Sequence, residues 1–198
     1  METEIEGKFL DINVEEIKNK LKSLNAKMTH KERLMNSAIY DYEDKRLGKI
    51  GGWIRVRDEG NKVTLSYKQL NDRTLHGTKE VSLTINNFEN ACLFLESIGL
   101  KKKTVEEKKR EEWILDEVEI SIDTWPWIPT FLEMEGKNEK SLRNVCKKLD
   151  LNWDEVIHGS VEAAYQKYFN VTEDEVSNWA SFVFTDNVPA WLEEKRIK

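Results

Sequence analysis

The feature that most constrains the fold of this chain is a set of short segments in which charged and apolar side chains alternate. Alternation with a period of two is typical of a β-strand with two different faces. In residues 52–58, Arg55 and Arg57 fall on one face while Ile54 and Val56 fall on the other. The same pattern recurs in residues 3–9, 63–68, 107–113, 120–123 and 131–136. Each predicted strand therefore has one charged face and one apolar face.

An open antiparallel sheet with one face in water would also produce this alternation. The kind of charge favours another arrangement, because acidic pairs lie at both ends of the strand-rich region and basic pairs lie between them. The acidic pairs are Glu4 with Glu6 and Glu133 with Glu135. Like charges two residues apart on one strand face repel unless a cation or a polyanion lies between them. The pattern favours a closed eight-stranded antiparallel β-barrel with a charged lumen, which has room for one small ligand.

Helical periodicity appears at two places inside the strand-rich region and again beyond it. Residues 14–24 and 88–99 carry apolar side chains at three- and four-residue spacing, and an asparagine precedes each segment as a candidate cap. After residue 137 the pattern becomes helical. We therefore predict an α+β fold with a barrel over residues 1–136 and a C-terminal helical extension over residues 137–198 that packs on the barrel.

Charge and hydropathy exclude several classes of function. The net charge of -6 and the pI near 5.3 argue against bulk binding of nucleic acid or of an anionic membrane. No run of 18 apolar residues is present, and the charged N-terminus lacks the apolar core of a signal peptide, so we expect a cytoplasmic protein. The histidines, His30, His76 and His158, have no partner at a spacing that suggests a catalytic triad.

The charges suit a linear triphosphate as ligand, because such a molecule carries four or more negative charges. Arginine forks and lysine ammonium groups can hold its oxygens. Glutamate carboxylates can hold Mg²⁺ or Mn²⁺ between protein and phosphates.

The order of these segments resembles the CYTH superfamily, also called the triphosphate tunnel metalloenzymes, which includes class IV adenylyl cyclases, thiamine triphosphatases and inorganic triphosphatases. The resemblance begins with an ExExK pattern in Glu4-Ile5-Glu6-Gly7-Lys8 and extends to about residue 136. The later matching elements are Tyr40-Asp41, Trp53-Ile54-Arg55-Val56-Arg57, Leu65-Ser66-Tyr67-Lys68, Lys108-Lys109-Arg110, Ile122-Asp123 and Phe131-Leu132-Glu133-Met134-Glu135. The region from Asp123 to Gly136 also looks like a bacterial branch often labelled as CyaB-type adenylyl cyclase.

The resemblance implies roles for individual residues. The carboxylates implied to face a metal are Glu4, Glu6, Glu133, Glu135, Asp123 and Glu80. The cationic side chains implied to bind phosphate are Lys8, Arg55, Arg57, Lys68, Lys108 and Arg110. Lys8, Arg57 and Glu6 are the candidate catalytic residues. The chain departs from the family at Ser82, where relatives often have a second acid, and this puts a second metal on that wall in doubt.

Three functions remain open from the sequence. The preferred one is a metal-dependent triphosphatase that acts on tripolyphosphate, ATP or thiamine triphosphate, because hydrolysis needs only the charged lumen. The first alternative is a class IV adenylyl cyclase that makes cyclic AMP and pyrophosphate from ATP, which also needs a base pocket and a placed ribose. The second is a non-catalytic module that binds polyphosphate or a nucleotide. The outer barrel face or the C-terminal helices could support a homodimer.

Overall fold

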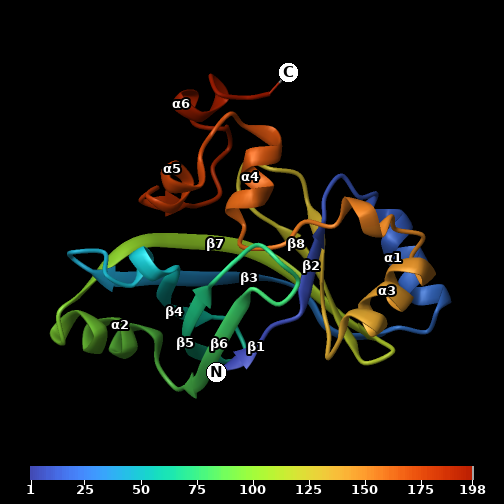
Figure 1. Cartoon of the computed structure of the whole chain (residues 1–198), viewed down its shortest axis with the longest axis horizontal. Helices are drawn as coiled ribbons and strands as arrows, with labels where there is room; N and C mark the ends of the chain where they lie inside the picture. Colours follow the sequence, from blue (N-terminus) through green and yellow to red (C-terminus); the bar gives the residue numbers. More distant parts are fainter. Residues whose placement is uncertain (198) are drawn as a thin grey trace.

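A curled, mainly antiparallel β-sheet forms the centre of the computed structural model, which describes residues 1–197 (Figure 1). Its strands are β1 (Glu2–Thr3), β2 (Glu6–Phe9), β3 (Lys27–Tyr42), β4 (Gly52–Asp58), β5 (Val63–Leu70), β6 (Thr78–Ile85), β7 (Leu100–Leu115), β8 (Val118–Thr124), β9 (Phe131–Glu135) and β10 (Ser181–Phe182). The strand order is β1-β6-β5-β4-β3-β7-β8-β9-β2, and β10 pairs with β7 in parallel.

The N-terminal segment joins the two ends of this strand order. β1 pairs with β6 and β2 pairs with β9, although only two residues separate β1 from β2. Between them, the Glu4 amide donates to the Thr78 carbonyl at 3.0 Å, and the Gly136 amide donates to the Ile5 carbonyl at 3.1 Å. If β1 and β2 are taken as one interrupted strand, the sheet curls through eight antiparallel strands. The predicted α+β class and antiparallel barrel architecture are confirmed, and the parallel β10 is an addition to them.

The helices of the first 150 residues cover the outside of the curled sheet, and the later helices pack over one end of it. They are α1 (Val14–Ser23), α2 (Phe88–Ser97), α3 (Glu139–Lys148), α4 (Glu162–Tyr168), α5 (Glu173–Ser177) and α6 (Ala190–Glu193), with short 3-10 helices at η1 (Gly48–Ile50) and η2 (Trp153–Glu155). The predicted asparagine caps are present: Asn13 accepts a hydrogen bond from the Glu16 amide at 3.2 Å, and Asn87 accepts one from the Asn90 amide.

The apolar strand faces point outward to the helices. Ile120 of β8 and Leu132 of β9 are buried in a core with Leu21 of α1 and Leu142 of α3. Figure 1 shows α1 and α3 together at this end of the sheet. A second core forms where α2 covers Val56 and its neighbours on β3 and β4. On these strands the outer faces are apolar and covered, whereas Val81 and Leu83 on the outer face of β6 remain exposed, and the charged faces line the interior.

The 16-residue strand β3 was not predicted, because its sequence does not alternate. It carries the run Lys31-Glu32-Arg33 and pairs with β7 through three register shifts. Each irregularity moves side chains between the two faces and removes the period of two from the sequence. Strand β3 nevertheless joins β4 to β7 and so completes the wall that carries most of the basic residues.

The last part of the chain packs over one end of the sheet (Figure 1). Tyr165 of α4, Phe182 of β10 and Leu192 of α6 are buried in a third core with Trp125 and Phe131. The Tyr165 hydroxyl donates to the Pro126 carbonyl at 2.8 Å. Among residues 1–197, no helix has the length and apolar character needed to cross a membrane.

Truncation of Leu142 tests whether α3 is part of the barrel core. Leu142→Ala removes a fully buried side chain and is expected to lower the free energy of unfolding by about 2–5 kcal/mol. Lys140→Ala, at an exposed position of the same helix, is the control and should change it by less than about 0.5 kcal/mol. Urea unfolding measures both variants. An equally small effect of Leu142→Ala would show that α3 does not contribute to the core.

Candidate functional site

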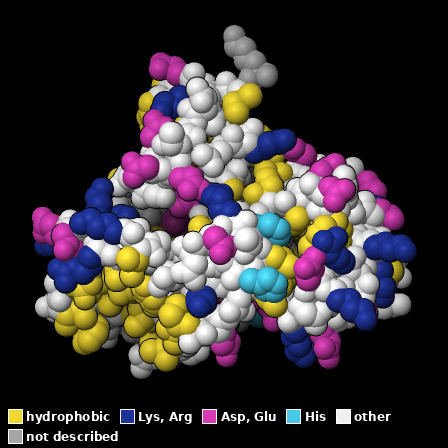
Figure 2. All heavy atoms as spheres, in the orientation of Figure 1, with side chains coloured by type: hydrophobic (Ala, Val, Ile, Leu, Met, Phe, Trp, Pro, Cys, Tyr) yellow, Lys and Arg dark blue, Asp and Glu magenta, His cyan; other side chains and the backbone are white. Residues whose placement is uncertain are grey.

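The interior of the curled sheet encloses one large cavity of about 730 Å³. Figure 2 shows the surface hollowed beneath the C-terminal segment, with acidic side chains at the opening. Every residue that the sequence marked as a candidate lines this cavity: Glu4, Glu6, Lys8, Arg55, Arg57, Lys68, Glu80, Lys108, Arg110, Asp123, Glu133 and Glu135. Residues from both ends of the strand-rich region therefore meet in one space, which we call the lumen.

Strand register sets opposite charges beside each other in the lumen. Lys8 of β2 lies opposite Glu133 of β9, as Lys68 of β5 lies opposite Glu80 of β6. Arg110 of β7 has Asp123 of β8 as its partner. Directly opposed residues on one face of a sheet lie within about 5.5 Å, so these pairings bring the charged groups into contact range. Buried charges of both signs are thereby neutralised by neighbours across the strands.

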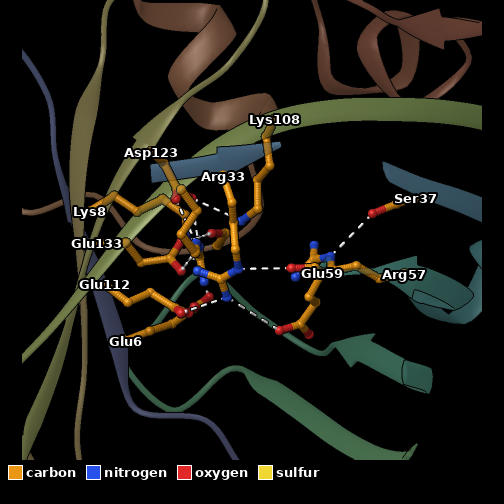
Figure 3. A network of polar contacts seen from close by, with 12 residues as sticks. Glu6, Lys8, Arg33, Ser37, Arg57, Glu59, Lys108, Glu112, Asp123 and Glu133 are labelled. Atoms are coloured by element: carbon orange, nitrogen blue, oxygen red, sulfur yellow. Dashed lines mark hydrogen bonds and ion pairs between the residues drawn. The ribbon is translucent and has the colours of Figure 1, made fainter. Parts of the chain in front are cut away.

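One charged cluster lies around Asp123 and Glu133 (Figure 3). Lys108 Nζ donates to Asp123 Oδ2 at 2.9 Å, and the Arg110 guanidinium donates to both Asp123 oxygens at 2.6 Å. Glu133 accepts from Arg110 at 2.8 Å and lies 3.1 Å from Lys8 Nζ. Burial alone would raise the pKa of Glu133, but these bases outweigh it and hold that pKa well below its usual range.

A second cluster lies where β5 and β6 meet the segment between β1 and β2. Lys68 Nζ is 2.8 Å from Glu4 Oε2 and 3.3 Å from Glu80 Oε2, and Arg55 is 3.5 Å from Glu80. Burial and the adjacent Glu80 carboxylate raise the pKa of Glu4 to about 8. The neighbouring carboxyl behaves oppositely, because contacts with Glu4, Lys68 and Arg55 lower the pKa of Glu80 against the effect of burial. At neutral pH this pair is therefore poised to share one proton.

Two buried basic side chains of the lumen, Lys108 and Arg57, have lowered pKa values. Burial and the nearby Arg110 lower the pKa of Lys108 to about 7, although Asp123 opposes the shift. Burial and the nearby arginines similarly lower the pKa of Arg57 to about 9, and the hydrogen bond from its Nε goes to the neutral Ser37 hydroxyl at 3.1 Å. Burial is the largest cause of both shifts and neighbouring cations add to it, so a bound anion would favour the charged forms of both groups.

Carboxylates of the lumen show the reverse shift. Burial, Glu133 and Glu6 raise the pKa of Glu135 of β9 to about 7. Glu4, between β1 and β2, has a buried Oε2 that accepts no well-aligned hydrogen bond, although Lys68 lies near it. Carboxylate oxygens are the ligands that Mg²⁺ and Mn²⁺ take in proteins, and a cation would favour the charged form of these carboxyls. Their donor chemistry therefore fits a divalent metal.

The carboxylates of the lumen do not form a preorganised metal site. Within residues 1–197, no three acidic, histidine or cysteine side chains are arranged to hold a metal ion. Asp123 is the candidate ligand least available to a metal. It is 1% exposed, and both of its carboxylate oxygens accept hydrogen bonds from Lys108 and Arg110. In this arrangement Asp123 orients the two bases.

Sequence reasoning missed several charged residues near the site. Arg33 of β3 donates to Glu112 Oε2 at 2.7 Å and to the Glu59 carbonyl at 2.8 Å, and so ties β3 to β7 and to the β4–β5 turn (Figure 3). The irregular pattern of β3 gave no signal for Arg33. Glu106 and Glu162 also line the lumen. Glu106 continues the alternation of Lys108 and Arg110 on β7, and this signal could have identified it.

Replacement of Asp123 tests how far the buried cluster stabilises the fold. Asp123→Asn leaves Lys108 and Arg110 without their carboxylate and is expected to lower the free energy of unfolding by about 3–5 kcal/mol at neutral pH. Because folding lowers the pKa of Asp123, its stabilisation is present above its unfolded pKa and is lost as the pH falls through its folded pKa.

The control is Asp116→Asn, which breaks an exposed ion pair with Lys148 and should cost less than about 1 kcal/mol. Denaturant unfolding at several pH values from about 7 downward measures the loss of unfolding free energy in Asp123→Asn and in Asp116→Asn. Equal losses in the two variants would contradict a stabilising role of the buried cluster.

The chain is similar to known proteins in sequence and in fold. The chain is 25% identical over 170 residues to a protein of Methanocaldococcus jannaschii named "Putative adenylate cyclase", an alignment that covers 81% of this chain and 95% of that protein. A solved structure from Vibrio parahaemolyticus, also described as a putative adenylate cyclase, superposes with a TM-score of 0.70 at 16% identity and covers 83% of this chain and 98% of the other.

Two further solved structures share the fold. The PH1012 protein of Pyrococcus horikoshii has a TM-score of 0.65 at 24% identity, over 77% of this chain and 93% of its own. A Hippeastrum protein, described as a putative adenylyl cyclase with a dominant triphosphatase activity, has a TM-score of 0.56 at 14% identity, over 84% of this chain and 96% of its own. The family model described as the CYTH domain matches residues 2–154. The chain belongs to the CYTH domain family.

Proposed function

We propose that this chain is a divalent-metal-dependent triphosphate hydrolase whose substrate binds in the lumen. The observation that carries the proposal is that one cavity is lined by buried basic and buried acidic side chains whose pKa values are shifted toward their neutral forms. Burial and neighbouring cations lower the pKa values of Lys108 and Arg57, and burial and neighbouring carboxylates raise those of Glu4 and Glu135. A polyanion together with a divalent cation would favour the charged forms of both sets.

The phosphates would lie against the basic side chains of β4, β5 and β7. Arg55 and Arg57 present guanidinium groups that can bind phosphate oxygens through two parallel hydrogen bonds. Lys108 would gain a full positive charge on binding, because an adjacent anion raises its pKa from about 7. Lys8 and Arg110 already pair with Glu133, so they would bridge the phosphates to the carboxylates.

The carboxylates Glu4, Glu6, Glu133 and Glu135 would hold Mg²⁺ or Mn²⁺ beside the phosphates, with Glu80 as a further oxygen donor. When bound, such an ion neutralises phosphate charge and lowers the pKa of a coordinated water. Arg57 would hold the oxygens of the phosphoryl group that is transferred, and Lys8, fixed by Glu6 and Glu133, would stabilise charge on the oxygens around the reacting phosphorus. The water that attacks adds its oxygen to the terminal phosphorus, and the released diphosphate takes the electron pair of the broken P–O bond.

Cyclisation of ATP is the second candidate, and the name of the Methanocaldococcus relative, a putative adenylate cyclase, favours it. In that reaction the ribose 3′-hydroxyl attacks the α-phosphorus and pyrophosphate leaves. The same basic residues would serve, but the nucleoside must also be held in one orientation. Hydrolysis makes fewer demands on the cavity, and the triphosphatase is therefore the preferred proposal.

An assay with three substrates distinguishes these reactions. Purified protein is incubated with tripolyphosphate, ATP and thiamine triphosphate in Mg²⁺ or Mn²⁺, and both phosphate and cyclic AMP are measured. The expected product is phosphate. Formation of cyclic AMP without phosphate would overturn the proposal in favour of the cyclase, and tight binding with no product would favour a non-catalytic module.

Arg57→Ala and Glu6→Gln test the site within this assay. Each is expected to lower kcat by about 100-fold or more, because each removes a charged group that acts on the reacting phosphate or on its metal. Arg143→Ala, on the exposed face of α3, is the matched control and should retain parental activity. Variants with intact circular dichroism spectra and activity within about twofold of the parent would remove these residues from the mechanism.

Metal affinity should depend on pH through the raised pKa values of Glu4 and Glu135. Below about pH 7 both carboxyls carry protons in the metal-free protein, and a metal must displace them. We expect the affinity for Mn²⁺, measured by calorimetry, to rise by about tenfold or more between about pH 6 and about pH 7. Glu135→Gln should reduce the pH dependence of the Mn²⁺ affinity, whereas Glu117→Gln, in the exposed β7–β8 turn, should leave it unchanged. A Mn²⁺ affinity of the parent that does not change with pH would contradict a role for these carboxyls.

A further inference from the structure

The last part of β6 has a neighbouring strand on one side only. β1 pairs with β6 as far as Glu80, whereas β5 pairs with the full length of β6. Among the strand pairings of residues 1–197, residues 81–85 of β6 pair with β5 alone. The first four of these residues are all exposed. The end of β6 therefore presents an open edge of the sheet to solvent.

Two residues direct their backbone hydrogen-bonding groups to this open edge. The Glu4 amide donates to the Thr78 carbonyl at 3.0 Å, so the backbone groups of Thr78 point away from β5. Because these directions alternate along a strand, the amides and carbonyls of Ser82 and Thr84 point to the same side as those of Thr78. An edge with unpaired amides and carbonyls is a template for pairing with another chain.

The inner face of this end of β6 lies outside the lumen. On β6 the lumen is lined by Thr78 and Glu80, and the next inward side chains, Ser82 and Thr84, do not line it. The Ser82 hydroxyl instead shares a hydrogen bond with the Ser66 hydroxyl of β5 at 2.8 Å. This end of β6 therefore extends past the charged cavity, and its edge can serve a role separate from the chemistry of the lumen.

The outer face at this edge is apolar and uncovered. Val81 is 48% exposed and Leu83 is 59% exposed, and Leu93 and Phe94 of α2 are exposed to a similar degree. Figure 2 shows hydrophobic side chains gathered at the lower left, over the region of α2 and β6 in Figure 1. Contiguous exposed apolar patches on a protein surface commonly mark interaction sites.

The edge also lacks the features that keep edge strands from pairing. Native edge strands are commonly protected by lysine, proline or a β-bulge. Residues 81–85 read Val-Ser-Leu-Thr-Ile, with no charge and no proline, and they pair with β5 without a register shift. The chain therefore presents a regular, uncharged edge beside an apolar surface.

We propose that this edge of β6 pairs with the same edge of a second copy of the chain, antiparallel and about a two-fold axis at Leu83. In this register Leu83 lies opposite the partner's Leu83, and Val81 lies opposite the partner's Ile85. Ser82 and Thr84 of the two copies exchange backbone hydrogen bonds. Apolar side chains thus meet apolar side chains on the outer face, and the two halves of the contact are equivalent, as a two-fold dimer requires.

Backbone direction and side-chain charge together select this register. A shift by one residue would set the outward backbone groups of Ser82 against those of Leu83, which point to β5. A two-fold axis at Ser82 would keep the hydrogen bonds but would set Lys79 opposite the partner's Ile85. The axis at Leu83 sets Lys79 opposite the partner's Asn87 and opposes no two charged residues along β6. The edge is therefore self-complementary, which favours a second copy of the chain as its partner.

Sedimentation velocity over a range of protein concentrations tests the dimer, and it needs no substrate. The parent should be a dimer at about 50 µM. Leu83→Lys sets two ammonium groups opposite each other at the axis and should raise the dissociation constant by about tenfold or more. Thr84→Pro should act in the same direction, because it removes an amide that points to the open edge and is not needed by β5. Ile197→Lys, at an exposed apolar position outside β6 and α2, is the control and should keep the parental value.

Circular dichroism shows whether each variant keeps the parental fold. A parent that is monomeric at about 50 µM would overturn the proposal and would leave the edge to an extended segment of a different protein. Folded Leu83→Lys and Thr84→Pro variants that both keep the parental dissociation constant would also overturn it, because the dimer would then use another surface.

Disulfide cross-linking tests the register of the pairing. Residues opposed at the axis without mutual backbone hydrogen bonds have Cα atoms about 4.5 Å apart, within reach of a disulfide. With oxidised glutathione as the oxidant, Leu83→Cys should form a covalent dimer on a non-reducing gel, since the native Cys92 and Cys146 are buried. Lys79→Cys is the control, because its two copies lie about 27 Å apart in this register. Equal cross-linking of the two variants, or none in Leu83→Cys, would overturn the proposed pairing.

Discussion

The structure depends on the neutralisation of buried charge across neighbouring strands. A curled sheet with its apolar faces turned outward to the helices must place its polar faces in the interior, where single charges are costly. The chain meets this constraint through register: Lys8 faces Glu133, Lys68 faces Glu80 and Arg110 faces Asp123. A shift of one residue in any of these strands would turn its charges toward the helices. The pairing therefore fixes the register of the strands and the composition of the cavity together.

Several charged groups of the lumen are buried at a cost that a bound ligand would reduce. Burial and neighbouring cations lower the pKa values of Arg57 and Lys108. Burial and neighbouring carboxylates raise those of Glu4 and Glu135. Burying these groups in one cavity costs stability in the free protein, and it provides complementary charge for a bound anion and a bound cation. A set of such perturbed groups within one cavity is typical of functional sites.

Much of this arrangement could be predicted from the sequence because the main strands alternate regularly. The charged faces of β2, β4, β5 and β9 were visible as residues two apart, and the asparagine caps marked α1 and α2. Strand β3 could not be predicted, because its register shifts remove the alternation. The C-terminal wall was also missed, since the position of Glu162 in the lumen depends on tertiary contacts such as the bond from Tyr165 to the Pro126 carbonyl.

A crystal structure of the protein with tripolyphosphate and Mn²⁺ would test the proposed site most directly. We expect anomalous scattering from manganese beside the carboxylates of β2 and β9, with phosphate oxygens within hydrogen-bond distance of Arg57 and Lys108. Rearrangement of the Lys8 and Lys68 ion pairs should accompany binding, because the metal competes with these ammonium groups for the same carboxylates. Phosphate bound only outside the lumen, or manganese away from these carboxylates, would contradict binding of a metal–triphosphate complex in the lumen.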